Sequence, residues 1–150
     1  MRLYLVHHGD AVGPDVDIRR PLSEAGRRSV ERLAAAAAGL GIRPTVVWHS
    51  GKLRARQTAE AYWRACNALA EFGATRDLQP DDPPGWMRDR LRFESRDVLL
   101  AGHYPHLPRL LASLRGEPEG ALAAFPPHGV VALRTDDAGQ TWVEEWRLEA

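Results

Sequence analysis

The chain has 150 residues, and its 20 acidic and 20 basic side chains give a formal net charge of zero. This length suits a single domain over residues 1–150 with a full hydrophobic core. The charge balance disfavours a nucleic-acid partner, and no apolar run approaches the roughly 18 residues that a membrane span needs. Nucleic-acid binders and membrane proteins are therefore the classes that these numbers exclude first.

The only cysteine, Cys66, rules out an intrachain disulfide, and this low cysteine content is typical of a reducing compartment. It falls on the apolar face of a predicted helix, so we interpret it as a packing residue. The N-terminal residues enter a predicted strand at once and lack the pattern of a signal peptide. We therefore expect a cytoplasmic protein.

Predicted strands and helices alternate along most of the chain. Three short apolar runs have the length and composition of buried strands: residues 3–6, 45–48 and 97–101. Apolar residues at helical spacing predict a helix from the candidate N-cap Ser23 to about residue 40, a second over about 52–69, and a third that begins at Pro105. This alternation predicts parallel strands joined by helices.

Two later regions complete the predicted fold. Residues 71–96 are interrupted by prolines, and we expect a short strand near 75–78 and a short helix near 86–91. Residues 130–134 and 141–148 flank an Asp-Asp-Ala-Gly turn, which predicts an antiparallel hairpin. The expected fold class is α/β: a three-layer α/β/α domain with a mostly parallel mixed sheet and a C-terminal antiparallel hairpin.

Polar residues follow each of the three predicted parallel strands. His8 follows the first, the segment from Ser50 to Arg56 follows the second, and His103 follows the third. Because the carboxyl ends of parallel strands meet at one edge of a sheet, we expect these groups to converge. Arginine forks match the oxygens of a phosphoryl group, and an imidazole can act as a nucleophile toward phosphorus. The pattern therefore indicates a phosphoryl site with a reactive histidine.

Several segments resemble signatures of the histidine phosphatase (phosphoglycerate mutase-like) superfamily. The sequence L-V-H-H-G-D-A at residues 5–11 resembles its R-H-G signature, residues 50–58 resemble its S-P-x-x-R-A-x-Q-T segment, and residues 102–105 resemble its G-H-x-P motif. The short length and residues 17–23 resemble the short bacterial phosphohistidine phosphatase branch. The resemblance covers nearly the whole chain, in the same order and at comparable spacing.

The resemblance implies a role for each matching residue. His8 would be the nucleophile that carries the phosphoryl group, and His103 would bind and stabilise the group during transfer. Arg54 would bind the phosphoryl oxygens, with Arg20 beside the pocket. Asp17 is the best placed candidate for the acid that protonates the leaving group. The superfamily needs no metal or other cofactor, because arginines and histidines neutralise the phosphoryl charge.

His7 is the main departure from the family pattern, because it occupies the phosphate-binding position of the arginine in R-H-G. A free histidine has a pKa near 6.5 and is mostly neutral at pH 7, whereas arginine is always charged. The loss of one charge-assisted contact costs about 1.5–3 kcal/mol of phosphoryl binding. We expect a bound phosphate dianion to favour protonated His7 and to recover part of this loss.

Three functions stay open at this point. The short chain without an evident cap favours a phosphatase that acts on phosphohistidine in proteins. A phosphatase of small phosphoesters would instead have a closed pocket built from residues 79–92. A module that binds phosphate or phosphoproteins without turnover would explain His7 as a sign of a decayed active site.

The other histidine patterns have weaker interpretations. His7, His8 and Asp10 lack the H-x-x-x-H spacing of metal ligands, so a metal site is the less favoured interpretation of this segment. His106 and His128 match no motif, and we expect them at the surface or in loops.

Overall fold

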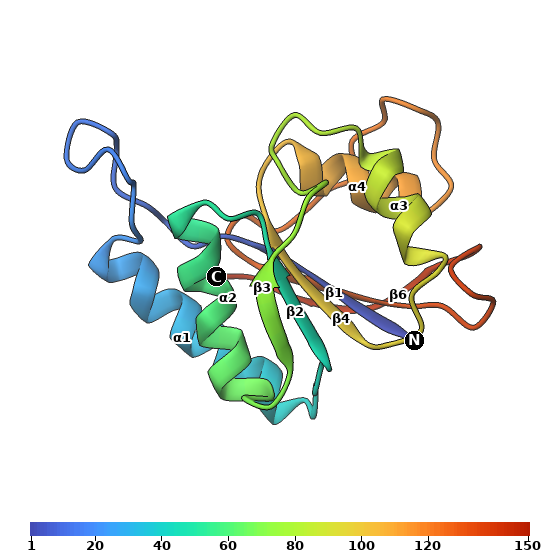
Figure 1. The fold of residues 1–150 in the computed structure, drawn as a ribbon, viewed down its shortest axis with the longest axis horizontal. Coiled ribbons are helices and arrows are strands. Elements are labelled where there is room, and N and C mark those ends of the chain that lie inside the picture. The colour runs from blue at the N-terminus through green and yellow to red at the C-terminus, as the bar shows by residue number, and fades with distance from the viewer.

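The computed structural model describes residues 1–150 and is built on one six-stranded sheet with helices on both faces (Figure 1). The strands are β1 (Arg2–His7), β2 (Val46–His49), β3 (Glu71–Ala74), β4 (Val98–Gly102), β5 (Val130–Arg134) and β6 (Val143–Leu148). Their order is β3-β2-β4-β1-β5-β6, in which the first four strands are parallel and β5 and β6 are antiparallel to their neighbours. The predicted mixed α/β sheet with a C-terminal hairpin is confirmed.

Two pairs of helices cover the two faces of this sheet. The helices are α1 (Glu24–Gly39), α2 (Leu53–Cys66), α3 (Pro84–Leu91) and α4 (His106–Leu114). Helices α1 and α2 pack together on one face, and α3 and α4 pack together on the other (Figure 1). None of the four has the length and apolar character that a membrane crossing requires.

The composition of the strands explains why both faces carry helices. Successive side chains of a strand point to opposite faces of the sheet. In β1, Leu3 and Leu5 join the core under α3 and α4, while Tyr4 and Val6 join the core under α1 and α2. Residues 3–6 of β1 are all apolar, so both faces of this strand have to be covered.

Local sequence determines where α1 begins. Ser23 precedes the helix, and its Oγ accepts a hydrogen bond from the Gly26 N–H at 3.0 Å, so the predicted N-cap is confirmed. Ser23 Oγ also donates to Asp10 Oδ2 at 2.7 Å, which ties the helix to the segment after β1. Cys66, at the end of α2, is buried with its Sγ 3.8 Å from the Ala34 carbonyl oxygen, as expected of a packing residue.

The structure corrects the prediction for the segment between α2 and β4. Strand β3 covers Glu71–Ala74, earlier than the strand predicted near 75–78, and α3 begins at Pro84. Because β3 is an edge strand and is only partly buried, its apolar pattern is weak. Leu78, the last residue of the predicted strand, is fully buried although it lies in a loop.

The expectation that His106 lies at the surface or in a loop is wrong. His106 is the first residue of α4, is fully buried, and has no hydrogen-bond partner at either ring nitrogen. The reason is that α4 is covered on nearly all sides, so that most of its residues are buried. In a helix that is buried on nearly all sides, a residue can be buried even when it lies off the apolar face.

Candidate active site

Residues from three strand ends converge at one edge of the sheet, as the sequence predicted. Strand β1 ends at His7 and leads into His8, β2 leads into Ser50, and β4 leads into His103. The His8 N–H donates to the Gly102 carbonyl at 3.1 Å, and the ring centroids of His8 and His103 lie 5.1 Å apart. The topology therefore places two histidines from distant parts of the chain next to each other.

His8 has one ring nitrogen held and one free. Its Nδ1 lies 2.7 Å from the Gly9 carbonyl oxygen, so Nδ1 carries a hydrogen and donates it. In the neutral ring, Nε2 then holds the lone pair that a nucleophile needs. Burial is the main cause that lowers the pKa of His8 to about 4, so the ring is neutral at pH 7.

The glycine after His8 lets this segment pack closely against both helices of its face. A Cβ on Gly9 would lie 2.5 Å from Val30 Cγ2 of α1. On the other side, the Gly9 N–H donates to Thr58 Oγ1 at 3.0 Å, and that hydroxyl donates to the Arg54 carbonyl at 2.8 Å. Thr58, a residue of the family motif, thus links the segment of His8 to the first turn of α2.

His103 is almost fully buried, with 2% of its surface exposed. Its Nε2 lies 2.6 Å from Ser50 Oγ, and the Lys52 N–H donates to the same hydroxyl at 3.3 Å. The Ser50 hydroxyl can donate its own hydrogen to Nε2, and in that tautomer the ring hydrogen lies on Nδ1. That Nδ1 is buried and has no partner within the protein, so it can donate to a ligand oxygen. Burial lowers the pKa of His103 to about 3.

Two arginines give the site its positive charge. Arg54 lies in the first turn of α2, and its buried Nε has no partner within the protein. Arg20 has a backbone φ of 49° and donates from Nε to the Val12 carbonyl at 3.1 Å. Burial and the charge of Arg20 lower the pKa of Arg54, so the two guanidinium groups are close enough to repel each other. An anion between them would relieve this repulsion.

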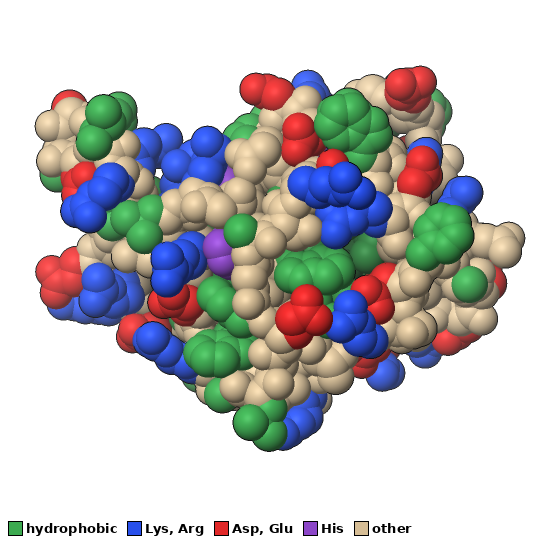
Figure 2. Space-filling model, in the orientation of Figure 1, with side chains coloured by type: hydrophobic (Ala, Val, Ile, Leu, Met, Phe, Trp, Pro, Cys, Tyr) green, Lys and Arg blue, Asp and Glu red, His purple; other side chains and the backbone are tan.

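The surroundings of the two arginines are also positive. Figure 2 shows Lys and Arg side chains around a hollow between the projecting loop of residues 10–20 and the rest of the molecule. Helix α2 has no side-chain cap and no acidic residue in its first turn, so the positive end of its dipole is uncompensated. The charges of Arg54 and Arg20 both act to lower the pKa of His8. The site is therefore suited to an anion.

His7, which replaces the family's arginine, is held as a neutral ring. Its Nδ1 accepts a hydrogen bond from the His128 N–H at 2.7 Å, so the ring hydrogen lies on Nε2. The ring stacks between Tyr104 and His128, with centroid distances of 4.2 Å and 4.7 Å. Burial lowers the pKa of His7 to about 3. We refer to Tyr104, His7 and His128 as the ring stack.

The ring stack changes how His7 can serve an anion. Protonation of Nδ1 would break the hydrogen bond from the His128 N–H, so the expectation that a phosphate dianion favours protonated His7 does not fit this geometry. His7 instead offers one neutral N–H donor where arginine would offer a charged fork.

His128 lies in the loop before β5, as expected, but it contacts the site rather than solvent alone. It is half-buried, and its Nδ1–H donates to the His8 carbonyl at 2.6 Å. The antiparallel pairing of Val6 with Val130 brings this loop beside the end of β1. Sequence analysis missed this contact because His128 lies 120 residues after His8 and matches no motif.

Ring nitrogens of His7, His8 and His128 lie within 4.8 Å of one another, which is the spacing of a potential metal site. Each histidine ligand of a metal needs a free lone pair. In His7, however, the Nδ1 lone pair accepts the His128 N–H and Nε2 carries the hydrogen. Arg54 and Arg20 also place positive charge beside the cluster. These donors therefore fit a phosphoryl anion better than a metal cation.

Asp17 lies in the projecting loop, and its carboxylate is engaged by Arg19. Asp17 Oδ1 accepts from the Arg19 N–H at 2.9 Å, and Oδ2 accepts from Arg19 Nη2 at 3.2 Å. These bonds lower the pKa of Asp17, whereas an acid that protonates a leaving group needs a raised pKa. The hydrogen bonds and ion pairs of Asp17 connect it to Arg19 and not to His8. Its assignment as the acid stays a prediction without support from the geometry.

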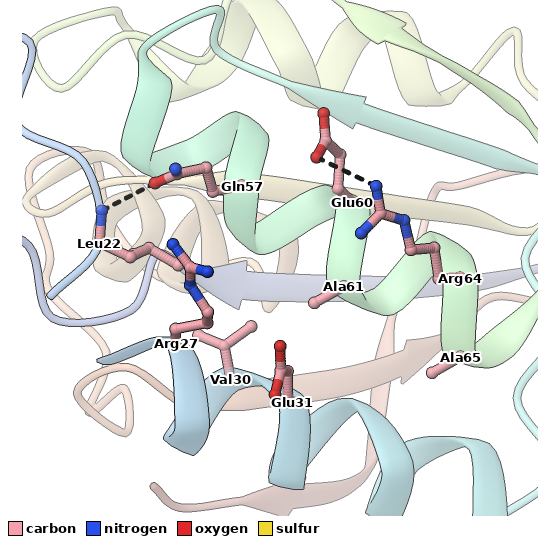
Figure 3. Close-up of a pocket in the computed structure, with 9 residues that line it drawn as sticks. All are labelled: Leu22, Arg27, Val30, Glu31, Gln57, Glu60, Ala61, Arg64 and Ala65. Carbon is pink, nitrogen blue, oxygen red and sulfur yellow. Dashed lines mark hydrogen bonds and ion pairs between the residues drawn. The ribbon is translucent and has the colours of Figure 1, made fainter. Parts of the chain in front are cut away.

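A separate groove of about 480 Å³ lies between α1 and α2 (Figure 3). At one end, Gln57 Oε1 accepts a hydrogen bond from the Leu22 N–H at 2.7 Å, which holds the segment that follows Arg20 against α2. Further along, side chains of both charges face the groove: Arg27, Glu31, Glu60 and Arg64. None of the histidines of the site lines this groove, so its contribution to the site is the support that Gln57 provides.

The fold and the site together define an α/β protein with a cluster of histidines and arginines suited to an anion. The model of the histidine phosphatase superfamily (branch 1) matches residues 3–79, just over half of the chain. The chain belongs to this superfamily, as the sequence motifs predicted. No curated protein matches the sequence at a significant level.

Solved structures with the same fold match nearly the whole chain. The protein histidine phosphatase SixA, solved with tungstate, is 23% identical, with a TM-score of 0.83 and coverage of 99% of this chain and 97% of that one. A candidate phosphohistidine phosphatase SixA from Agrobacterium tumefaciens is 25% identical, with a TM-score of 0.80 and the same coverage of 99% and 97%. A mycobacterial glucosyl-3-phosphoglycerate phosphatase is 16% identical, with a TM-score of 0.72 and coverage of 99% of each chain. The expected phosphoglycerate mutase-like fold is confirmed.

Proposed function

We propose that this chain is a metal-independent phosphatase that acts through a phosphohistidine intermediate on His8, and that its substrate is phosphohistidine on a protein. The observation that carries the proposal is the bare Nε2 of His8 beside Arg54 and His103, in a pocket of positive charge. A neutral imidazole with a free lone pair, next to donors for phosphoryl oxygens, is equipped to attack phosphorus.

In the first step, His8 Nε2 bonds to phosphorus while the bond from phosphorus to the leaving group breaks. Arg54 neutralises charge on the phosphoryl oxygens, and the His103 Nδ1–H and the His7 Nε2–H donate to them. The ring of His8 becomes positive when it is phosphorylated. Its Nδ1–H remains bound to the Gly9 carbonyl, which stabilises that charge.

In the second step, a water molecule attacks the phosphorus of phosphorylated His8, and His8 leaves as a neutral ring. Covalent catalysis thus divides one difficult displacement into two easier ones. The same donors hold the phosphoryl oxygens in both steps. They perform the charge neutralisation that a metal ion performs in other phosphoryl-transfer enzymes.

The open hollow beside the projecting loop supports a substrate that is carried on a protein (Figure 2). The segment expected to close the pocket of a small-molecule phosphatase, residues 79–92, instead packs α3 against α4. Its hydrogen bond to the site runs from Gln79 Nε2 to the Ser50 carbonyl at 2.7 Å, and supports Ser50. In the projecting loop, Val16 and Ile18 are 73% and 86% exposed and offer apolar contacts to a protein surface.

The comparisons agree with this substrate class. The SixA structure solved with tungstate is named a protein histidine phosphatase and aligns over nearly all of both chains. The glucosyl-3-phosphoglycerate phosphatase has a lower identity and a lower TM-score. A small phosphoester is therefore the alternative substrate.

The intermediate is tested by mass spectrometry of the protein after reaction with a protein domain that carries phosphohistidine. We expect one phosphate on His8 and its release as orthophosphate on longer incubation. In the control His8→Asn, the amide N–H can still donate to the Gly9 carbonyl, but the nucleophile is absent. This variant should show neither phosphorylation nor turnover, and equal turnover by both proteins would contradict the mechanism.

The substrate class is tested by comparing kcat/KM for the phosphohistidine domain with kcat/KM for small phosphoesters. A higher value for the protein substrate is expected. A higher value for a small phosphoester would favour the alternative substrate class. Binding of orthophosphate without release of phosphate from any substrate would identify a binding module instead.

A further inference from the structure

We infer that His128 is a second catalytic histidine, whose Nε2 gives a proton to the leaving group and later takes one from the attacking water. The inference rests on the proposed phosphatase function and adds the acid that the site otherwise lacks. It makes phosphoesters with poor leaving groups substrates of the same site.

The position of His128 places it near the path of the leaving atom. A ring nitrogen of His128 lies within 4.8 Å of a ring nitrogen of His8. Phosphorus in position for attack lies about 3–3.5 Å from the nucleophile, and the leaving atom is in line beyond it, roughly 5 Å from His8 Nε2. A group at this distance from His8 reaches the leaving atom, directly or through one water, when its free nitrogen faces the side of phosphorus away from His8.

Hydrogen bonds decide which nitrogen of His128 is free. Its Nδ1 faces the His8 carbonyl oxygen at 2.6 Å, and because that oxygen only accepts, Nδ1 carries the hydrogen. Nε2 of the neutral ring therefore holds the lone pair and can add a proton without losing the bond to His8. His7 lacks this freedom, because protonation of its Nδ1 would break the hydrogen bond from the His128 N–H.

No carboxylate of the site competes for this role. Asp17 is paired within the projecting loop, and Asp10 Oδ2 accepts a hydrogen bond from Ser23 Oγ at 2.7 Å. No carboxylate is among the groups whose charge shifts the pKa values of His8 and His103. This favours a histidine for the proton transfer, because an imidazole can both give and take a proton.

The backbone at His128 also indicates a functional placement. Its φ is 57°, in the left-handed region that residues other than glycine rarely adopt. Two bonds hold it there: the His128 N–H donates to His7 Nδ1, and Nδ1–H donates to the His8 carbonyl. Such conformations cluster at functional sites, where surrounding contacts offset their cost.

The protons balance over the two steps. In the first, the bond from phosphorus to the leaving oxygen breaks as His8 Nε2 bonds to phosphorus, and protonated His128 transfers its Nε2 hydrogen to that oxygen. In the second, neutral His128 takes a hydrogen from the water whose oxygen attacks phosphorus, as the bond from phosphorus to His8 breaks. His128 ends protonated, as it began.

His128→Asn separates proton transfer from structural support. Asparagine tolerates the left-handed backbone, and its amide N–H can donate to the His8 carbonyl, but it cannot transfer a proton. The quantity to compare is kcat/KM, which reports transfer of the phosphoryl group to His8. It is measured for 4-nitrophenyl phosphate and for an alkyl phosphate with a poorer leaving group. The alkyl phosphate should lose about 10²–10⁴-fold, whereas 4-nitrophenyl phosphate stays close to wild type. Inhibition by orthophosphate should be unchanged.

His128→Gly provides a second measurement. Glycine adopts the positive φ freely and leaves space where the ring was. Added imidazole should restore turnover of the alkyl phosphate by this variant. Failure of imidazole to restore it would count against proton transfer at this place.

Several results would overturn the inference and leave the proposed function intact. They are an equal loss for both substrates in His128→Asn, no loss for either, and a wild-type protein that hydrolyses 4-nitrophenyl phosphate but not the alkyl phosphate. A wild-type protein that neither turns over any phosphorylated substrate nor carries phosphate on His8 would reject the proposed function, and the inference with it.

Discussion

The two sides of the site offer a phosphoryl group different kinds of contact. On one side, Arg54 and Arg20 supply permanent charge, and we refer to them as the arginine side. On the other, the ring stack of Tyr104, His7 and His128 supplies stacked rings and one N–H donor, from neutral His7. The family's arginine would have placed a third charge where His7 stands.

The two sides also differ in how the chain builds them. Arg54 is positioned by the start of α2, and Arg20 donates to a carbonyl eight residues earlier in the same loop. The ring stack instead joins β1, the segment after β4 and the loop before β5, with His7 and His128 separated by 121 residues. The comparison shows that the charged groups of the site, Arg54 and Arg20, are positioned by nearby residues of the sequence. The tautomer of His7, in contrast, is set by a contact with a residue far along the chain.

The largest expected effect comes from removing charge on the arginine side. Arg54→Ala should lower kcat/KM by about 10²–10³-fold, because a donor to the developing phosphoryl charge is lost. Arg56→Ala is the matched control, since Arg56 lies on the same helix but is exposed and paired with Glu60. Equal losses in both variants would show that general positive charge, and not Arg54 itself, matters.

The next effect adds charge to the ring stack. His7→Arg should strengthen inhibition by orthovanadate by about 1.5–3 kcal/mol, the value of a charge-assisted contact. The same change leaves the His128 N–H without its acceptor, so the Tm should fall. His7→Gln, a neutral donor, controls for shape. Unchanged inhibition by vanadate in His7→Arg would mean that the neutral ring does not limit anion binding.

Acid should weaken the folded state through the buried histidines. Burial lowers the pKa of His7 and His103 to about 3 and of His8 to about 4, against about 6.5 when unfolded. Between those values the unfolded chain binds more protons than the folded protein. The free energy of unfolding therefore decreases as the pH is lowered, by up to roughly 1.4 kcal/mol per pH unit for each histidine.

Urea unfolding at several values between pH 7 and pH 5 measures this slope above the range where carboxylates titrate. His7→Gln should reduce the slope, because one of the depressed groups is gone. A free energy of unfolding that does not change over this range would contradict the burial of neutral histidines.

The smallest expected effect concerns the outer ring of the stack. Tyr104 Oη donates to the Phe125 carbonyl at 2.6 Å, and Tyr104→Phe removes this bond but keeps the ring on His7. Stability should fall by about 0.5–1.5 kcal/mol, the net value of a hydrogen bond, with little change in turnover. Tyr104→Leu, which also removes the stacking, should reduce turnover more. If both variants reduce turnover equally, the hydroxyl and not the stacking supports His7.

Much of the fold and part of the site were predictable because their signals are local. Buried parallel strands are continuous apolar runs, and His8 and His103 follow two of them directly. Ser50 and Thr58 could be predicted because they match the family motif, but their hydrogen bonds to His103 and Gly9 could not. β3 and His106 were misplaced because their burial depends on neighbours that no local pattern reveals.

The sequence by itself determined the sheet, the superfamily, and the presence of two histidines and an arginine at one edge. Only the tertiary structure decided what the change from arginine to His7 means. The antiparallel pairing of β1 and β5 brings His128 beside His7, and one hydrogen bond at 2.7 Å then assigns the ring hydrogen to Nε2. A tautomer depends on the partner that a nitrogen meets in space, and here that partner lies 121 residues along the chain.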